Sequence, residues 1–240
     1  MINKKNIIII SLLIVTIILV YLIITKNQEL KKLKKDNNTS KIAEKTNNKE
    51  TVRTKLNKNE NVVIFGDSIT EFYPVNDIYD NYQIIGSGKS GYKTTDLLDN
   101  MEDLLYKYNP TKVIMLIGTN DILKDTSEEK QKETVDNIKK ICNEIKKNRP
   151  KAKLYIESLY PIDENGDKNM IGDRTNEAIK NINKDLKEYC YSKKIRYIDM
   201  YDKLTDKDGN FDDRYTNDGL HPNDLGYAKI TKLLLPYIYE

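Results

Sequence analysis

The sequence predicts an α/β protein, with a three-layer α/β/α, flavodoxin-like, doubly wound domain that is built on a five-stranded parallel sheet and preceded by one transmembrane helix. Short apolar runs alternate with longer segments in which apolar residues recur at helical spacing, and this alternation is typical of parallel sheets with right-handed crossovers. A separate run of 18 mainly apolar residues lies near the N-terminus. We expect residues 1–25 to be a membrane anchor, residues 26–59 a basic disordered linker and residues 60–240 the folded domain.

The apolar run at residues 7–24 has the length of a membrane span. As a helix it would be about 27 Å long, close to the ~30 Å hydrocarbon core of a bilayer. It is longer than a usual signal-peptide core, and no Ala-x-Ala-like cleavage site follows it. We therefore expect an uncleaved single-pass anchor, with a cleaved signal peptide as the alternative. The lysines that follow the span favour a cytoplasmic location for the C-terminal side. A large domain can nevertheless be translocated despite such charges. We therefore expect the domain to be extracellular, with the protein anchored in the cell membrane.

Charge divides the chain at the end of the linker. Residues 1–59 carry 13 Lys and Arg against four acids, a net charge of +9, whereas the remainder carries 27 against 33, a net charge of −6. The linker holds too few apolar residues to offset the entropy of ordering. It could lie on anionic lipid head groups, or its lysines could simply reflect an AT-rich genome. The acidic folded part argues against a nucleic-acid partner.

The elements of the folded domain follow in order. Thr94 or Thr95 can cap the first helix, a capping box at Thr126-Ser127-Glu128-Glu129 starts the second, and Asn223 can cap the last. The spacing predicts strands at residues 62–65, 82–85, 112–117, 153–157 and 195–199, and helices over residues 94–108, 126–147, 173–192 and 223–239. The expected strand order is 2-1-3-4-5.

The first strand is followed at once by Gly66-Asp67-Ser68. Ligands of open α/β sheets bind at the carboxyl ends of the strands, where a following helix presents unpaired N–H groups. A serine at that position is either a helix N-cap or a nucleophile. A helix cap is the ordinary interpretation of such a serine. The residues at the far end of the chain favour a nucleophile.

That far end contains Asp218 and His221, the only histidine of the chain. A serine hydroxyl is a weak nucleophile until a base takes its proton, and imidazole suits that task near neutral pH. Asp218 lies three residues before His221, close enough in a tight turn for its carboxylate to hold the ring N–H. A lone histidine is more often structural, but this spacing indicates a Ser-His-Asp triad.

Two more blocks, Gly86-Ser87-Gly88-Lys89-Ser90-Gly91 and Gly118-Thr119-Asn120-Asp121, each follow an apolar run. With the serine and histidine blocks they give the order Ser, Gly, Asn, His along the chain. This set resembles the SGNH (GDSL-type) hydrolase family, and the resemblance covers residues 61–240. One block alone is a weak signal, whereas four blocks in this order are specific.

The resemblance implies a serine hydrolase with Ser68, Asp218 and His221 as its catalytic residues. The developing oxyanion would be held by the backbone N–H of Ser68, and the resemblance adds the backbone N–H of Gly91 and the side-chain amide of Asn120. Taken singly, Gly91 could be a turn glycine and Asn120 a loop cap.

Asp67 and Asp121 are expected to brace the loops around these residues, with a cap or turn role as the alternative. The chain departs from the family pattern at Gly86, where the family usually has asparagine. We interpret this as a variation in backbone support and expect the oxyanion site to be retained.

The sequence contains three other candidate binding or reactive sites, and the signal for each is weaker. Gly88-Lys89-Ser90 looks like the end of a P-loop, but that pattern requires glycine where the chain has Gln83. The acidic segment 206–213 lacks the spacing of a calcium loop and is expected to be solvated. Cys142 and Cys190 have no metal-ligand spacing, and buried free thiols are the default, although a disulfide remains the alternative. No metal or cofactor is expected.

These observations together predict a membrane-anchored serine esterase. The expected substrates are short-chain acyl esters, with O-acetyl groups on cell-envelope carbohydrate favoured because an outward linker would reach that layer. Residues 158–176 also resemble platelet-activating-factor acetylhydrolase-like members of the family. The alternatives are a lysophospholipase-like lipid acyl hydrolase, an acyltransferase with the same site, and an inactive envelope-binding module. The sequence leaves the oligomeric state open.

Overall fold

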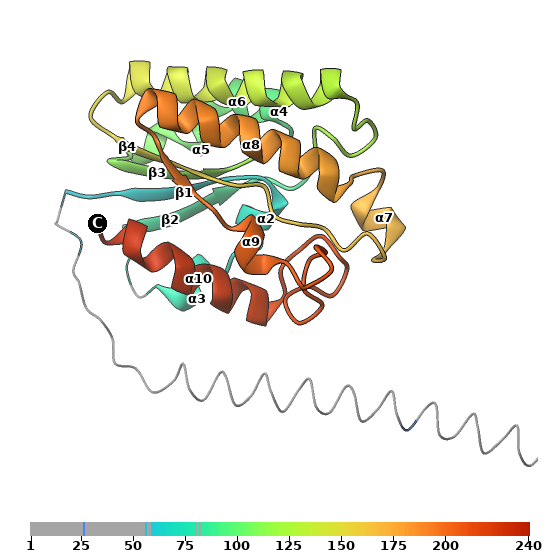
Figure 1. Cartoon of the computed structure of the whole chain (residues 1–240). Helices are drawn as coiled ribbons and strands as arrows, with labels where there is room; N and C mark the ends of the chain where they lie inside the picture. The colour runs from blue at the N-terminus through green and yellow to red at the C-terminus, as the bar shows by residue number, and fades with distance from the viewer. Residues whose placement is uncertain (1–25, 27–55, 57–58, 80, 82) are drawn as a thin grey trace, which may run out of the picture. The chain divides into compact units, whose positions relative to one another are not determined.

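The computed structural model describes residues 26, 56, 59–79, 81 and 83–240 (Figure 1). The membrane span expected at residues 7–24 lies outside the described residues, as does most of the linker expected at 26–59. Within the described ranges, no helix is both long and apolar enough to cross a bilayer. The described residues of the domain expected at 60–240 lie in one compact unit.

The sheet has five parallel strands in the order β2-β1-β3-β4-β5, which confirms the predicted order. The central pairing sets Val62 of β1 opposite Ile84 of β2 and Lys112 of β3. The strands are β1 Val62–Gly66, β2 Ile84–Gly88, β3 Lys112–Leu116, β4 Lys153–Glu157 and β5 Arg196–Ile198. Because all five strands are parallel, their carboxyl ends lie along one edge of the sheet.

Strand β2 differs from its predicted bounds of 82–85. The stretch Gly86-Ser87-Gly88, expected to follow the strand, forms its second half and pairs with β1 as far as Gly66 opposite Gly88. A Cβ atom at Gly88 would lie only 2.3 Å from the Glu71 backbone nitrogen. Glycine is therefore needed here because the short helix after β1 packs directly on the strand, and the glycine does not mark a turn.

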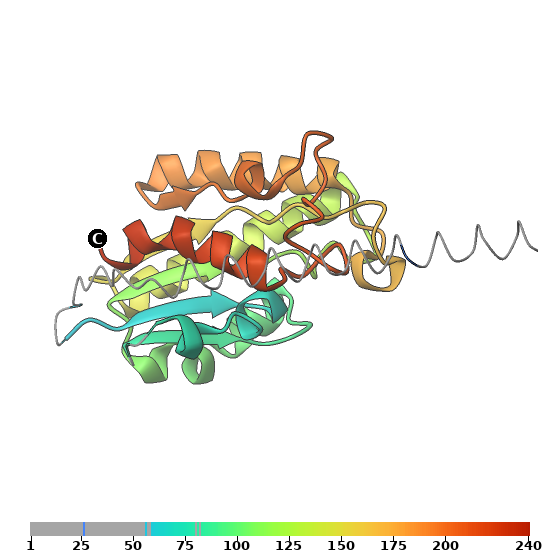
Figure 2. The ribbon, with the colours of Figure 1, turned by 90° about the horizontal axis from the view of Figure 1, so that it is seen from below.

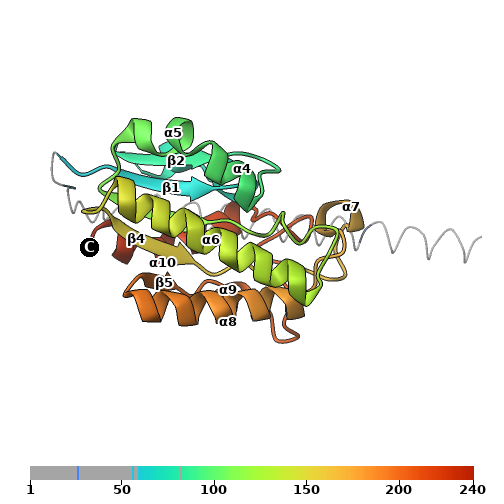
Figure 3. The same ribbon diagram turned by 90° about the horizontal axis from the view of Figure 1, so that it is seen from above.

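Helices cover both faces of the sheet (Figure 1). Helices α4, α5, α6 and α8 cover one face, where α6 and α8 lie side by side (Figure 3). Helix α10 lies across the other face, with α3 beside it (Figure 2). The α-helices are α2 Ser68–Glu71, α3 Val75–Ile78, α4 Thr94–Asp99, α5 Met101–Leu104, α6 Glu128–Asn148, α7 Lys168–Ile171, α8 Asn176–Lys193, α9 Tyr201–Leu204 and α10 Asp224–Ile238, and η1 Tyr106–Tyr108 is a 3₁₀ helix.

The helix predicted over residues 94–108 is broken at Asn100. The Asn100 side chain donates to the Asp96 carbonyl at 2.8 Å, and its backbone N–H donates to the Leu97 carbonyl, so the first segment ends there. Asparagine competes with the helix in this way because its short amide can bond nearby backbone groups. Thr94 is the first helical residue and not the cap, since its hydroxyl donates to Asp121.

The other helix starts follow the predicted caps closely. Asn223 accepts from the Gly226 N–H at the start of α10, so that predicted cap is confirmed. The cap of α6 is Ser127, which accepts from the Lys130 N–H, so this helix starts one residue after the capping box Thr126-x-x-Glu129 would place its cap. Helix α8 begins at Asn176, three residues later than predicted, because Thr175 caps it. The remaining bounds lie within two residues of the predicted ones, and those of β4 are as predicted.

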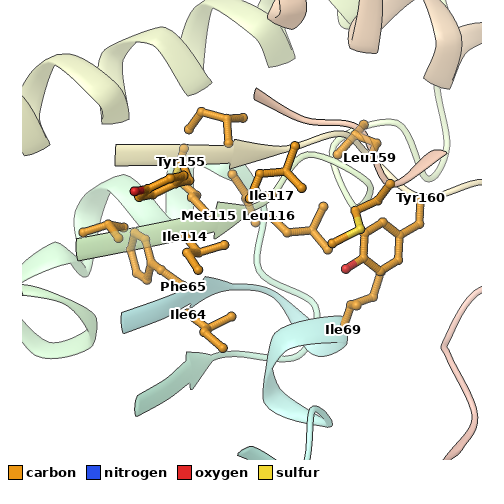
Figure 4. Packing of buried hydrophobic residues seen from close by; sticks show 14 of the residues in the cluster. Ile64, Phe65, Ile69, Ile114, Met115, Leu116, Ile117, Tyr155, Leu159 and Tyr160 are labelled. Atoms are coloured by element: carbon orange, nitrogen blue, oxygen red, sulfur yellow. The ribbon is translucent and has the colours of Figure 1, made fainter. Parts of the chain in front are cut away.

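The core is centred on β1 and β3, whose side chains are buried along both strands. Figure 4 shows Ile64 and Phe65 of β1 beside Ile114 and Met115 of β3, with Tyr155 of β4 beyond them. Burying side chains of this size stabilises the fold by about 1.5–3 kcal/mol each. The strands that carry the site residues at their ends are thus the best-packed elements of the sheet.

Candidate active site

Ser68 is placed by the abrupt turn from β1 into α2. It is 6% exposed and is the first residue of the helix. The N-cap is Asp67, whose Oδ1 accepts from the Ile69 backbone N–H at 3.0 Å. The Ser68 hydroxyl therefore has no capping role and is free to bond elsewhere.

That hydroxyl lies against the imidazole from the other end of the domain. Ser68 Oγ is 3.0 Å from His221 Nε2, and His221 Nδ1 is 2.8 Å from Asp218 Oδ2. Asp218 Oδ1 also accepts from the backbone N–H groups of Leu220 and His221. Thr216 fixes the far side of this turn, since its hydroxyl donates to the His221 carbonyl. The structure thus brings together the three residues proposed as a triad.

The protonation of Asp218 follows from these bonds. Partial burial raises the pKa of its carboxyl, but hydrogen bonds from the His221 ring and from the His221 and Leu220 backbone outweigh burial, so the pKa is lowered overall. The charged carboxylate can only accept, and it therefore holds the proton of the ring on Nδ1. Nε2 is left as an acceptor for the Ser68 O–H, which is the arrangement that general-base activation needs.

The donors predicted for an oxyanion come from two loops beside Ser68. Gly91 has φ +78°, in the left-handed region that favours glycine, and a Cβ there would meet open space. Within the described part of the chain, no acceptor takes the backbone N–H of Ser68 or of Gly91. Asn120 Nδ2 donates to the Tyr92 carbonyl at 3.0 Å, which ties the Gly91 loop to the loop after β3. Since the amide nitrogen carries two N–H groups, one of them is left for another acceptor.

Asp121 makes the contacts expected of a bracing residue, whereas Asp67 has the alternative role of a helix cap. Asp121 accepts from the backbone N–H and the hydroxyl of Thr94, which joins the loop after β3 to the start of α4. Burial raises the pKa of Asp121. Asp67 is fully buried, and Asp67 Oδ2 has no hydrogen-bond partner among the described residues. Burial raises the pKa of Asp67 to about 7.

Residues 64–229 match the family model of the GDSL-like lipase/acylhydrolase family, and this match covers more than half of the chain. The chain belongs to this family. Its family is therefore one of lipases and acylhydrolases, and the resemblance seen in its sequence blocks is confirmed.

Among curated proteins, this GDSL-like hydrolase is 29% identical over 180 residues to N-acylneuraminate cytidylyltransferase of Escherichia coli O18:K1:H7, a match that covers 73% of this chain and 40% of that protein. It is 30% identical over 172 residues to a multidomain esterase of Ruminococcus flavefaciens, covering 63% of this chain and 20% of that protein. The chain thus spans less than half the length of either relative.

Two solved structures share most of the fold of the GDSL-like hydrolase. A protein of Streptococcus pneumonia named as a platelet activating factor has a TM-score of 0.69 and 30% identity, over 88% of this chain and 97% of that one. A GDSL-like lipase of Bacteroides thetaiotaomicron has a TM-score of 0.67 and 25% identity, over 84% of this chain and 97% of that one.

Two residues of the site are not apparent from the sequence. Arg174 is 4% exposed, and Arg174 Nη2 donates to Asn120 Oδ1 at 2.8 Å. A charged residue just before a helix is ordinarily solvated, so a single sequence gives no signal for it. Phe72, at the end of α2, is 52% exposed, and the centroid of its ring lies 5.3 Å from that of His221. An isolated aromatic residue in a turn-rich segment carries no signal either.

The P-loop-like stretch and the acidic segment both make hydrogen bonds within the protein. Ser90 bonds to Glu71 through its N–H and hydroxyl, so the P-loop-like stretch of the GDSL-like hydrolase is tied to α2. Asp206 accepts from backbone N–H groups of its own loop. Among the residues with described positions, no three His, Cys, Asp or Glu side chains gather as metal ligands. Cys142 and Cys190 are buried free thiols, as the default interpretation expects.

Proposed function

We propose that this protein is a membrane-anchored serine esterase that hydrolyses short-chain acyl esters, with O-acetyl groups on cell-envelope carbohydrate as its substrates. The observation that carries the proposal is the continuous line of hydrogen bonds from Ser68 through His221 to Asp218, at 3.0 and 2.8 Å. The apolar run at residues 7–24 supports the membrane anchor, and the size of the domain after it supports an extracellular orientation.

Acylation begins when Ser68 Oγ attacks the ester carbonyl carbon while His221 Nε2 takes the hydroxyl proton. Asp218 stabilises the imidazolium that forms. The carbonyl oxygen becomes an oxyanion and accepts from the N–H groups of Ser68 and Gly91 and from the Asn120 amide. As the tetrahedral intermediate collapses, the bond to the alcohol oxygen breaks and His221 gives that oxygen its proton.

Deacylation repeats these steps with water. Water attacks the acyl carbon and gives its proton to His221 Nε2, and the bond to Ser68 Oγ then breaks as the proton returns to the serine. In both half-reactions the His221 imidazole takes the proton of the attacking group and gives it to the leaving oxygen.

The position of Phe72 bears on the alcohol half of the substrate. Because His221 protonates the leaving oxygen, the alcohol must lie beside the imidazole, and the exposed Phe72 ring lies beside that imidazole. An aromatic face there can cover an apolar surface such as the C–H face of a sugar ring. The names of two relatives, one referring to an acylated sugar and the other to an esterase, support a carbohydrate ester.

The test is hydrolysis of p-nitrophenyl esters by the purified chain, compared with Ser68→Ala. Ser192→Ala is the matched control, because its hydroxyl donates only to the Tyr189 carbonyl on α8. We expect the Ser68 variant to lose nearly all activity and the Ser192 variant to keep it. Wild-type rates equal to those of Ser68→Ala would favour an inactive binding module.

An acyl series from acetyl to palmitoyl separates the enzymatic alternatives. A maximum at acetyl supports the proposal, whereas a maximum at long chains favours a lipid acyl hydrolase. Turnover that rises with an added alcohol, without a matching release of free acid, favours an acyltransferase. Protease treatment of intact cells should remove the domain, and full protection would place it in the cytoplasm.

A further inference from the structure

We infer that Arg174 is a positioning residue of the oxyanion site, which sets the orientation of the Asn120 amide and strengthens it as a donor to the reacting oxygen. This inference rests on the proposed function, since it concerns the same oxyanion. It adds a residue that lies behind the donors and does not touch the substrate.

Arg174 is held in place by four hydrogen bonds. Its Nε donates to the Thr119 carbonyl at 2.7 Å, and its Nη1 donates to the carbonyls of Met170 and Ile171, both at 2.9 Å. Nη2 donates to Asn120 Oδ1 at 2.8 Å. The guanidinium thus connects the end of α7 to the loop after β3, and its planar fork leaves it little freedom to move.

The contact with Arg174 determines which end of the Asn120 amide faces the site. An amide can be turned over with little change in shape, and only its hydrogen bonds decide between the two orientations. A guanidinium can donate but cannot accept, so Asn120 Oδ1 must face Arg174. Nδ2 must then face away, where one N–H reaches the Tyr92 carbonyl and the other is left for the oxyanion.

The positive charge of Arg174 also affects the strength of the Asn120 amide as a donor. A carbonyl oxygen that accepts from a cation draws electron density from the amide nitrogen, and hydrogen bonds linked in this way strengthen one another. Burial lowers the pKa of Arg174 to about 10, so the cation persists at neutral pH. The buried carboxyl of Asp67 interacts with this cation, and burial raises the pKa of Asp67 to about 7.

The test is a double-mutant cycle with Arg174→Gln, Asn120→Ala and the combined variant, assayed on p-nitrophenyl acetate. Asn120→Ala should lower kcat by roughly 10²–10³-fold. Arg174→Gln should lower kcat on the order of 10-fold to 100-fold with little change in KM, because the contact acts on charge that develops in the transition state. If Arg174 acts through Asn120, the combined variant should be no slower than Asn120→Ala alone by more than about threefold.

Two further variants keep the result interpretable. Arg174→Lys retains the charge but cannot reproduce the fork, so its kcat should fall between the wild-type and Arg174→Gln values. Arg196→Gln is the matched control, because this arginine is exposed and pairs with Glu240 at the surface. Its kcat should equal that of the wild type. If Arg174→Gln does not fold, Arg174→Lys takes its place in the cycle.

Losses that multiply in the combined variant would overturn the inference, since they would show that Arg174 acts independently of Asn120. An unchanged kcat in Arg174→Gln would overturn it as well. Failure of the proposed function gives a different pattern, because Ser68→Ala would then be as active as the wild type. If Ser68→Ala is inactive and the losses in the cycle multiply, only the role of Arg174 is rejected.

Discussion

The buried carboxyl of Glu157 should make the stability of the fold depend on pH. Glu157 ends β4, is 2% exposed, and accepts from the Tyr160 hydroxyl at 2.7 Å. Burial raises its pKa from 4.5 to about 7; the hydrogen bond from Tyr160 opposes this rise and the nearby Asp67 adds to it. We predict that Glu157→Gln removes this pH dependence.

The magnitude follows from the difference in pKa between the folded and unfolded states. Each pH unit of difference is worth about 1.4 kcal/mol, so a rise from 4.5 to about 7 corresponds to about 3 kcal/mol. The folded state keeps the proton where the unfolded chain has released it. The stabilisation is therefore complete below pH 4.5, falls as the pH rises through 7, and is absent above that.

The assay is urea unfolding of the wild type and Glu157→Gln at steps from pH 4 to 8. The wild-type free energy of unfolding, minus that of the variant, should fall by about 3 kcal/mol across this range. Any fixed cost of burying the new amide is the same at every pH and does not affect the slope. Glu188→Gln, on the exposed side of α8, is the control for removal of a carboxylate. A wild-type minus Glu157→Gln difference that stays constant with pH would refute the reasoning.

Three other predictions concern the site and the thiols. Asp218→Asn should lower kcat by roughly 10²–10⁴-fold with KM nearly unchanged, because the His221 ring loses the charge that fixes its tautomer; an unchanged kcat in steady-state ester hydrolysis would contradict the triad. Phe72→Ala should raise KM for acetyl esters of bulky alcohols and leave that for methyl acetate unchanged, and equal effects on both would remove Phe72 from substrate binding. Burial raises the pKa of Cys142 and Cys190 to about 12. Iodoacetamide at pH 8 should therefore label both thiols only in urea, as measured by mass spectrometry of the intact chain. Rapid labelling of the native protein would contradict their burial.

The hydrogen-bonded set of Ser68, His221 and Asp218 could be predicted because its parts are local. Asp218 and His221 lie three residues apart in one turn, and Ser68 directly follows an apolar strand, so each piece can be recognised within a few residues. The order of the strands then places the pieces at the same edge of the sheet. The one long-range step, joining Ser68 to His221, was supplied by the fold class and the family resemblance.

The parts that could not be predicted depend on contacts between distant segments. The extension of β2 to Gly88 reflects the close approach of α2, and nothing near Gly88 in the sequence reports that approach. Arg174 looks like a solvated residue before a helix cap, and only the packing of α7 against the loop after β3 buries it. The break at Asn100 is different, since its cause is local, but the surrounding leucines at helical spacing favoured one continuous helix.

The hydrogen bond between Ser68 and His221 joins residues 153 positions apart, one beside the first strand and the other just before the last helix. A ribosome that has made only the residues before 221 has therefore produced the proposed nucleophile without its proposed base. If Ser68 and His221 act as proposed, ester hydrolysis becomes possible only after the segment that carries His221 has been made and has docked beside β1, so its appearance during synthesis would report that these two parts of the domain have come together.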